Sequence, residues 1–132
     1  MISYLVDTST IIDYLRGRQP SVELLNTIEG ELVSSYICLA ELYEGVYRVT
    51  NTTEMEKIVN KFFASLSFVY GVDVKIAKKF GEIRAQLKIK GAVIEDLDLM
   101  LAATCLVYDL TLITFNKKHF SHVSDLQIYP VK

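Results

Sequence analysis

Four residues with oxygen donors stand where strands should end or helices should begin. Asp7 follows an apolar run at the start of the chain, Glu41 lies in an apolar helical stretch, and Asp98 leads into a long apolar segment. Asn116 closes another strand-like run. Clustered carboxylates repel by about 4 kcal/mol per pair at about 4 Å and an effective dielectric constant of about 20. A fold that gathers them usually does so around a cation, and oxygen ligands suit Mg²⁺ or Mn²⁺.

Each acid also has an ordinary structural interpretation. Asp7 could cap the helix that follows it, because aspartate accepts hydrogen bonds from the free amides of a first helical turn. Glu41 could be a partly exposed helix residue, with its neighbour Glu44 as the functional acid. Asp96 fits a helix-start role better than Asp98, which leads directly into a helix that should be buried. An acid that enters a buried helix needs a partner, and a metal ion is one.

Apolar runs rich in β-branched and aromatic residues alternate with longer helical patterns along the chain. The expected strands span residues 2–6, 32–37, 66–70 and 112–115, with a fifth candidate at 126–129. The expected helices span residues 9–15, 21–28, 39–49, 53–64, 74–90 and 97–108. This alternation predicts an α/β fold, in which a central parallel β-sheet of four to five strands is flanked by helices on both faces. Such sheets bind ligands beyond the carboxyl ends of their strands, so Asp7 and Asn116 should share one cleft.

Length and composition fit one domain, residues 1–132. The chain has 51% hydrophobic and 23% charged residues, as an ordinary globular protein has. Its start lacks the basic segment of a secretory signal, and the longest apolar stretch, 99–108, is far shorter than the roughly 20 residues of a membrane span. We therefore expect a cytoplasmic protein with no membrane association. Cys38 and Cys105 have no CxxC spacing and should be small buried apolar residues.

A local basic segment contrasts with the net charge of −2. Residues 74–90 follow helical spacing with one apolar face, and the other face is rich in lysine and arginine. This face is either an ordinary solvated helix surface or a contact surface for the phosphates of a nucleic acid. In the second case the binding residues would be Lys78, Lys79, Arg84 and Lys88.

Four short motifs together resemble the PIN-domain ribonucleases, and most closely the toxin nucleases of VapBC-type toxin–antitoxin systems. Each motif is weak alone, but the four occur in the family's order and cover essentially the whole chain. They are Val6-Asp7-Thr8-Ser9, then Glu41-Leu42-Tyr43-Glu44-Gly45, then Asp98-Leu99-Met100-Leu101-Ala102-Ala103, and last Leu112-Ile113-Thr114-Phe115-Asn116-Lys117-Lys118-His119-Phe120.

The resemblance implies a ribonuclease that hydrolyses phosphodiester bonds with Mg²⁺ or Mn²⁺. Asp7, Glu41 and Asp98 would hold the metal, and Asn116 would complete the catalytic set. Many family members carry aspartate at the position of Asn116. An amide keeps an oxygen ligand but lacks the charge, so a second metal site would be weak, filled only with substrate, or absent. The hydroxyls that would orient ligands or contact phosphate are those of Thr8, Ser9 and Thr114.

The resemblance also implies partners. RNA would be the substrate, a cognate antitoxin would occupy a groove, and two copies would form a symmetric homodimer. Tyr43 or Tyr47, if exposed, would be natural anchors for the antitoxin. His119 would pack or contact a phosphate. A zinc site at His119 and His122 would need further ligands that the sequence does not place nearby.

Two other classes of protein are worth comparing. A phospho-acceptor receiver domain is also a parallel α/β fold, but it needs an acceptor aspartate at the end of its third strand. Here Val69-Tyr70-Gly71 provides no acid. A PIN-like domain that has lost activity and only binds a partner or RNA is the other alternative. Asn116 is its only support, and the three intact acids argue against it.

Overall fold

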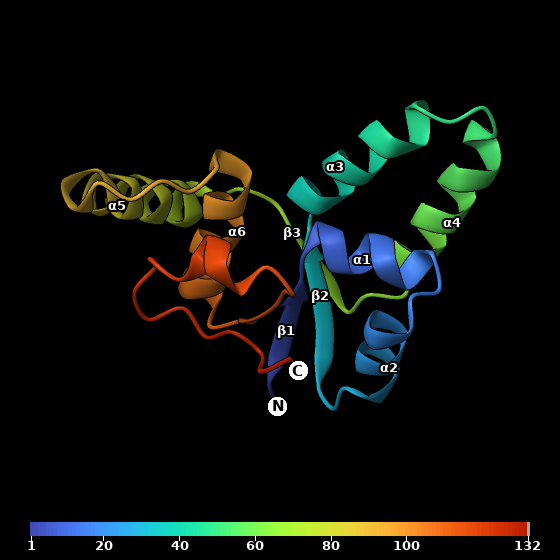
Figure 1. Cartoon of the computed structure of the whole chain (residues 1–132), viewed down its shortest axis with the longest axis horizontal. Coiled ribbons are helices and arrows are strands. Elements are labelled where there is room, and N and C mark those ends of the chain that lie inside the picture. Colours follow the sequence, from blue (N-terminus) through green and yellow to red (C-terminus); the bar gives the residue numbers. More distant parts are fainter. Residues whose placement is uncertain (132) are drawn as a thin grey trace.

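Four short parallel strands form the centre of the molecule. The computed structural model describes residues 1–131, and its sheet has the order β3-β2-β1-β4 (Figure 1). The strands are β1 (Ser3–Val6), β2 (Glu31–Ser35), β3 (Phe68–Tyr70) and β4 (Thr111–Ile113). The fifth candidate strand contributes only an isolated parallel bridge between Ile128 and Leu112. The predicted parallel sheet is confirmed, with four strands.

Six α-helices connect and cover the strands. They are α1 (Thr8–Leu15), α2 (Gln19–Thr27), α3 (Tyr36–Tyr47), α4 (Thr52–Ala64), α5 (Val74–Lys90) and α6 (Asp96–Tyr108). A 3-10 helix, η1 (Lys117–Phe120), follows β4. Helices α5 and α6 pack together on one side of the sheet, and α1 and α2 pack together on the other (Figure 1). The hairpin of α3 and α4 extends beyond the sheet. No helix within residues 1–131 is long and apolar enough to cross a membrane.

The two central strands are buried on both faces, as a parallel sheet between helices requires. Leu5 of β1 pairs with Val33 of β2 on one side and Leu112 of β4 on the other. All three side chains are almost completely buried. This rigid centre fixes the carboxyl ends of the strands, where the acidic residues lie.

Helix α3 begins three residues earlier than the sequence pattern predicts. Tyr36 and Ile37 read as the end of a strand because both favour extended backbone. The structure instead ends β2 at Ser35, whose hydroxyl accepts a hydrogen bond from the Ile37 amide at 3.0 Å. Serine at this position caps the helix and satisfies one of its free amides.

Candidate active site

Asp7 lies at the junction of β1 and α1. Its side chain is 5% exposed, and Oδ1 accepts a hydrogen bond from the Thr10 amide at 3.0 Å. The expected helix cap is therefore present. It uses one carboxylate oxygen, so capping α1 and binding a ligand are compatible roles for the same side chain.

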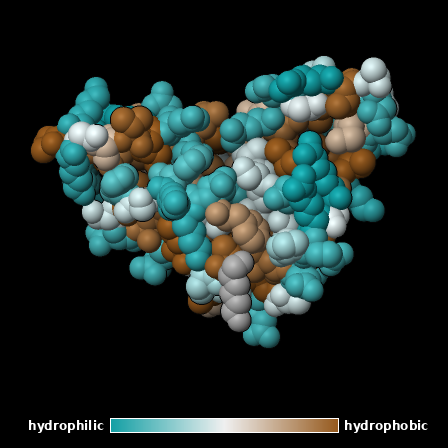
Figure 2. Space-filling model, in the orientation of Figure 1, coloured by the Kyte–Doolittle hydropathy of each residue, from teal (hydrophilic) through white to brown (hydrophobic). Residues whose placement is uncertain are grey.

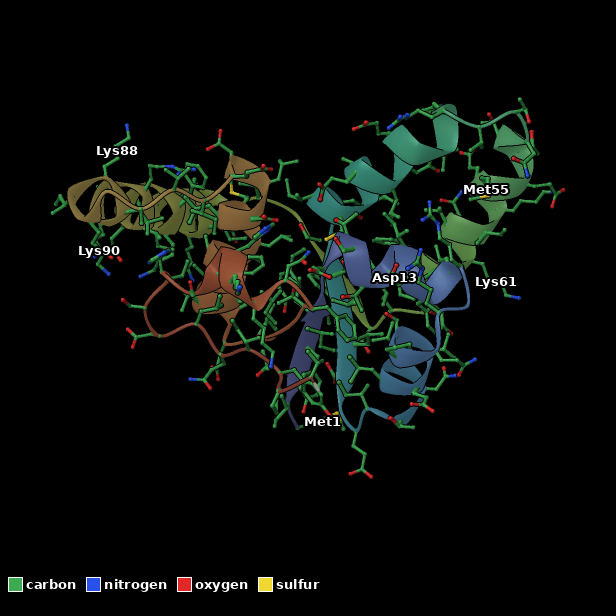
Figure 3. All side chains as sticks on the ribbon, in the orientation of Figure 1. Met1, Asp13, Met55, Lys61, Lys88 and Lys90 are labelled. Atoms are coloured by element: carbon green, nitrogen blue, oxygen red, sulfur yellow. The ribbon has the colours of Figure 1, made fainter. Side chains whose placement is uncertain are left out.

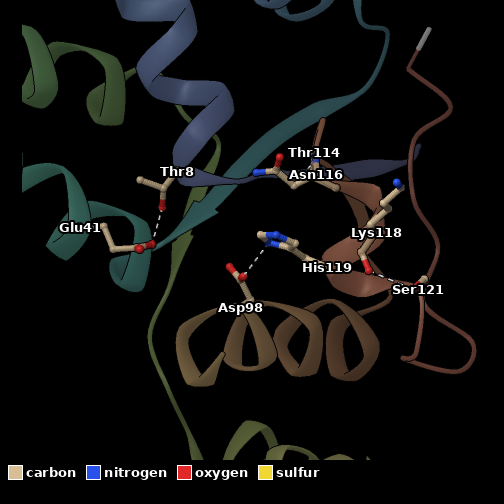
Figure 4. Close-up of polar contacts among 8 residues, drawn as sticks. All are labelled: Thr8, Glu41, Asp98, Thr114, Asn116, Lys118, His119 and Ser121. Atoms are coloured by element: carbon tan, nitrogen blue, oxygen red, sulfur yellow. Dashed lines mark hydrogen bonds and ion pairs between the residues drawn. The ribbon is translucent and has the colours of Figure 1, made fainter. Parts of the chain in front are cut away.

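Glu41 reaches the same edge of the sheet from α3. The hydroxyl of Thr8 donates a hydrogen bond of 2.6 Å to its Oε1 (Figure 4). Burial raises the pKa of Glu41, the bond from Thr8 opposes this rise, and the charges of Asp98 and Asp7 add to it. The alternative acid, Glu44, has a side chain that is 74% exposed and pairs with Arg48. Glu41 is therefore the acid of α3 that belongs to the site.

Asp98 reaches the site from the first turn of α6. Its carboxylate is partly buried and lies 3.5 Å from Nδ1 of His119, an ion pair when the histidine is protonated (Figure 4). Burial raises the pKa of Asp98, His119 lowers it, and the charges of Glu95 and Asp7 raise it further. The sequence suggested that Asp96 caps this helix. Asp96 is indeed the first residue of α6, but its side chain is 80% exposed and pairs with Arg84.

Asn116 and Thr114 occupy the end of β4. Thr114 is fully buried, and its hydroxyl accepts a hydrogen bond from the Asn116 amide at 3.0 Å. This short turn leaves the Asn116 side chain exposed on the side of η1 that carries His119 (Figure 4). Ser9 is also exposed, but among residues 1–131 its hydroxyl has no hydrogen-bond partner in the chain.

The side chains of this site are of the chemical type that binds a divalent cation, but they do not enclose one metal position. The carboxylates are near enough for Asp7 and Asp98 to raise the pKa of Glu41. Within residues 1–131, however, no three acids, histidines or cysteines are placed to hold one ion in common. Glu41 is held by Thr8, and Asp98 faces His119. Mg²⁺ is usually bound by one or two carboxylates while it keeps several waters, so the donor set suits this type of site.

The two cysteines lie beneath this edge. Both are buried and free, as the sequence predicted. Burial raises the pKa of Cys38 to about 11, and the nearby charges of Asp7 and Glu41 contribute to the rise. The thiol is therefore protonated at neutral pH and behaves as a packing group.

The basic residues of α5 lie in different environments. Lys78 and Lys88 are exposed, and Lys88 extends into solvent (Figure 3). Lys79 pairs with Glu82 at 2.8 Å. Arg84 differs most from expectation, because its guanidinium donates to the Ile94 carbonyl at 2.9 Å and pairs with Asp96 at 2.6 Å. Arg84 therefore ties α5 to the start of α6.

The two tyrosines expected as anchors for a partner also differ from each other. The hydroxyl of Tyr43 lies 2.9 Å from both Glu56 Oε2 and Asn60 Oδ1, which places it inside the α3–α4 hairpin. Tyr47 is 69% exposed. Of the two, Tyr47 is the side chain available to a partner.

His119 contacts an acid of the site, which the sequence pattern did not indicate. Packing is not its role, because its side chain is 62% exposed and faces Asp98. The contact between His119 and Asp98 forms because η1 packs against α6. No local sequence pattern predicts that these two segments lie together. Asn116 precedes η1 and His119 lies within it, and the His119 amide donates to the Asn116 carbonyl at 3.1 Å.

Fold and site together define an α/β domain with acidic residues at the carboxyl ends of its strands. The outline of the molecule is notched between the α3–α4 hairpin and the α5–α6 pair (Figure 2). The PIN domain family model matches residues 4–126. Over 127 residues the chain is 35% identical to ribonuclease VapC1 of Methanocaldococcus jannaschii, covering 95% of this chain and 85% of that protein. It is 32% identical to ribonuclease VapC19 of Mycobacterium tuberculosis, with 93% and 96% covered. The chain belongs to the PIN domain family.

Solved structures support the same assignment. The crystal structure of DNA-bound VapBC from Salmonella typhimurium has a TM-score of 0.89 to this structure at 26% identity, covering 98% of each chain. The similarity therefore extends over the complete fold, including the elements that carry Asp7, Glu41 and Asp98.

Proposed function

We propose that this chain is a divalent-metal-dependent ribonuclease that cuts RNA internally and serves as the toxin of a toxin–antitoxin pair. The observation that carries the proposal is the convergence of Asp7, Glu41 and Asp98 from β1, α3 and α6, with Asp7 and Asp98 raising the pKa of Glu41. The relatives named ribonuclease VapC, which match nearly the whole chain, support this assignment.

The protein side chains have distinct tasks in this proposal. Asp7, Glu41 and Asp98 would hold Mg²⁺ or Mn²⁺, and Asn116 would add an amide oxygen at the same edge. When bound, such an ion stabilises the charge that develops on the scissile phosphate. Thr8 fixes the rotamer of Glu41 through its 2.6 Å hydrogen bond. Thr114 fixes the backbone of Asn116, and Ser9 is exposed beside Thr8 where its hydroxyl can meet a phosphate.

Partners follow from the same proposal. The VapBC assembly from Salmonella typhimurium supports a cognate antitoxin as one of them. Tyr47 is the exposed aromatic that we assign to this contact, and a symmetric homodimer is the default assembly for a small protein of this kind. Lys78, Lys79 and Lys88 would attract the RNA backbone, and the protein would act in the cytoplasm, where its RNA substrate lies.

A second candidate function is RNA or partner binding without cleavage. One observation favours it: Asn116 provides an uncharged amide beside three carboxylates, which weakens any second cation site. The three acids remain in place, so this candidate predicts metal binding with little turnover.

Cleavage of purified cellular RNA tests the proposal. The protein is incubated with Mg²⁺, with Mn²⁺ or with a chelator, and the Asp98→Asn variant is purified and assayed in parallel. A matched control is Asp109→Asn, because Asp109 is exposed at the other end of α6 with φ of 54°. Asparagine accepts that left-handed conformation, so this variant should fold and cut normally.

Each outcome separates the two functions. Discrete cuts that need the metal, persist in Asp109→Asn and are lost in Asp98→Asn would support the ribonuclease, and mapping the new ends would identify the target. No cleavage above the Asp98→Asn background, with RNA still bound, would overturn it in favour of the binding domain.

A further inference from the structure

Phe115 is a partly buried aromatic side chain that lies outside the main core. It is half-buried, yet within residues 1–131 it belongs neither to the buried core nor to the partly buried side chains that pack against the core. Its backbone is nevertheless well fixed, because the Asn116 amide on one side bonds to the Thr114 hydroxyl on the other. An aromatic ring on a rigid turn, outside the core and still partly exposed, is suited to bind something outside the chain.

Phe115 lines three hollows in the surface. The smallest, of about 400 Å³, includes the apolar residues Leu24, Tyr129, Pro130 and Val131. The other two carry the basic residues. One, of about 510 Å³, is lined by Phe115, Asn116, Lys117, Lys118, His119 and Val131. The other, of about 520 Å³, is lined by Phe115 together with Asp13, Arg18, Gln19, Pro20 and Ser21 at the start of α2. The ring therefore stands in the middle of a track that runs from η1 to α2.

The track is continuous with the acidic site. His119 lines the first hollow and also a smaller one of about 170 Å³ that includes Asp98 and Glu95. The same His119 lies 3.5 Å from Asp98. A chain bound with one phosphate at the acids therefore has a path past His119 to the ring of Phe115.

We propose that Phe115 is the stacking platform for an unpaired base of the RNA, next to the phosphate that is cut. This inference rests on the proposed ribonuclease function and adds a base-binding subsite to it. Single-stranded nucleic acids are bound by aromatic side chains that stack on bases, flanked by positive charge that follows the backbone. The rigid turn prepares the ring in advance, which lowers the entropic cost of binding.

The charges along the track favour RNA over an apolar peptide. Lys118 is exposed in one hollow, and Arg18 lies in the other with a side chain that is 63% exposed and 3.5 Å from Asp13. Lys117 is less free, since its Nζ donates to the Val131 carbonyl at 3.0 Å. Gln19 offers an amide that can both donate to and accept from the edge of a base.

The test compares three variants with the parent chain. Phe115→Leu removes the aromatic face, Phe115→Tyr retains it, and Phe80→Leu is a control that removes another half-buried aromatic, one that lies on α5. Binding of a mixed-sequence single-stranded RNA octamer is measured by fluorescence anisotropy in chelator, so that no RNA is cut. Cleavage with Mn²⁺ is measured separately, with the ends mapped and KM and kcat determined.

The expected result is about tenfold weaker RNA binding by Phe115→Leu, with affinity retained by Phe115→Tyr and Phe80→Leu. Phe115→Leu should also raise KM more than it lowers kcat, and relax the sequence preference at one position beside the cut. Melting temperatures identify any variant that is simply misfolded, and Phe115→Met, which keeps an apolar side chain of similar length without the ring, replaces Phe115→Leu in that case.

Other results would contradict a stacking role for Phe115. Unchanged affinity and cut sites in folded Phe115→Leu, with an active parent chain, would reject the stacking role while the ribonuclease proposal stands. Loss of antitoxin binding with unchanged RNA binding would assign the track to the protein partner. A parent chain that binds RNA but does not cut would reject the ribonuclease, while the anisotropy comparison would still decide the role of Phe115.

Discussion

Thr8 and Glu41 are joined by a hydrogen bond of 2.6 Å although they lie 33 residues apart in the chain. The bond links the first residue of α1 to the middle of α3, so the residue that follows Asp7 holds the second acid of the site. It also lowers the pKa of Glu41, against the effect of burial. One hydroxyl thus orients the carboxylate and favours its ionised form.

The first prediction concerns this hydroxyl. Thr8→Val keeps the shape of the side chain but removes the donor, so the pKa of Glu41 should rise further and its carboxylate should lose its fixed rotamer. Groups that orient ligands in this way typically contribute about 10- to 100-fold to activity or metal affinity. We expect a loss of that order in RNA cleavage, with Thr8→Ser close to the parent. Equal cleavage rates for Thr8→Val and the parent would contradict this role.

The second prediction is a gain in stability from Glu41→Gln. Because the pKa of Glu41 is raised in the fold, the folded state holds the proton more tightly than the unfolded chain does. Stability is therefore lost as pH rises from the ordinary glutamate value, 4.5, through the raised folded value. Glu41 is only partly buried, so solvent screening keeps the effect small. In chelator at pH 7.5 we expect Glu41→Gln to melt on the order of 2 °C higher than the parent.

Two controls accompany this measurement. Glu44→Gln changes an exposed acid on the same helix and should leave the melting temperature unchanged. Lowering the pH toward the ordinary glutamate value should shrink the gain from Glu41→Gln, and Mn²⁺ should stabilise the parent more than the variant. A variant that melts below the parent at pH 7.5 would show that ionised Glu41 is not a cost to the fold.

The sequence predicted the sheet and the helices well because their signals are local. The pattern of residues 74–90 gave α5 with the same bounds as the structure, and the apolar runs located all four strands. The early start of α3 was missed because it depends on a single cap at Ser35. The contact between Asp98 and His119 was also missed, because η1 packs on α6 and no local pattern encodes that pairing.

The third prediction concerns Arg84. The sequence suggested that this residue binds RNA, but its contacts indicate that it stabilises the fold. Arg84→Gln loses the bond to the buried carbonyl of Ile94, and an unpaired buried carbonyl costs about 1 kcal/mol. The pair with Asp96 adds little, since that carboxylate is 80% exposed. We expect a lower urea midpoint and unchanged RNA affinity. If Arg84→Gln instead binds RNA more weakly and its urea midpoint is unchanged, Arg84 contacts RNA and does not stabilise the fold.

The fourth prediction concerns Lys88, which lies on the same helix and extends into solvent (Figure 3). Lys88→Ala should leave the urea midpoint unchanged. If Lys88 contacts a phosphate, the variant should bind RNA more weakly at low salt, and the slope of log affinity against log salt should fall by about one. Binding measured between low and physiological salt decides this. An unchanged slope would leave Lys88 as part of an ordinary solvated helix face.

The last prediction concerns Asn116, the uncharged member of the proposed ligand set. Its side chain is exposed, and its backbone is held by Thr114, so Asn116→Asp adds a charge without disturbing packing. Affinity for hard cations rises with the number of charged ligands. We therefore expect about tenfold tighter Mn²⁺ binding by calorimetry, which is about 1.4 kcal/mol, and cleavage that saturates at lower Mn²⁺. Asn116→Ala, which lacks both the charge and the oxygen, should bind more weakly than the parent. If all three proteins bind Mn²⁺ equally, Asn116 lies outside the metal site, and the three acids alone account for it.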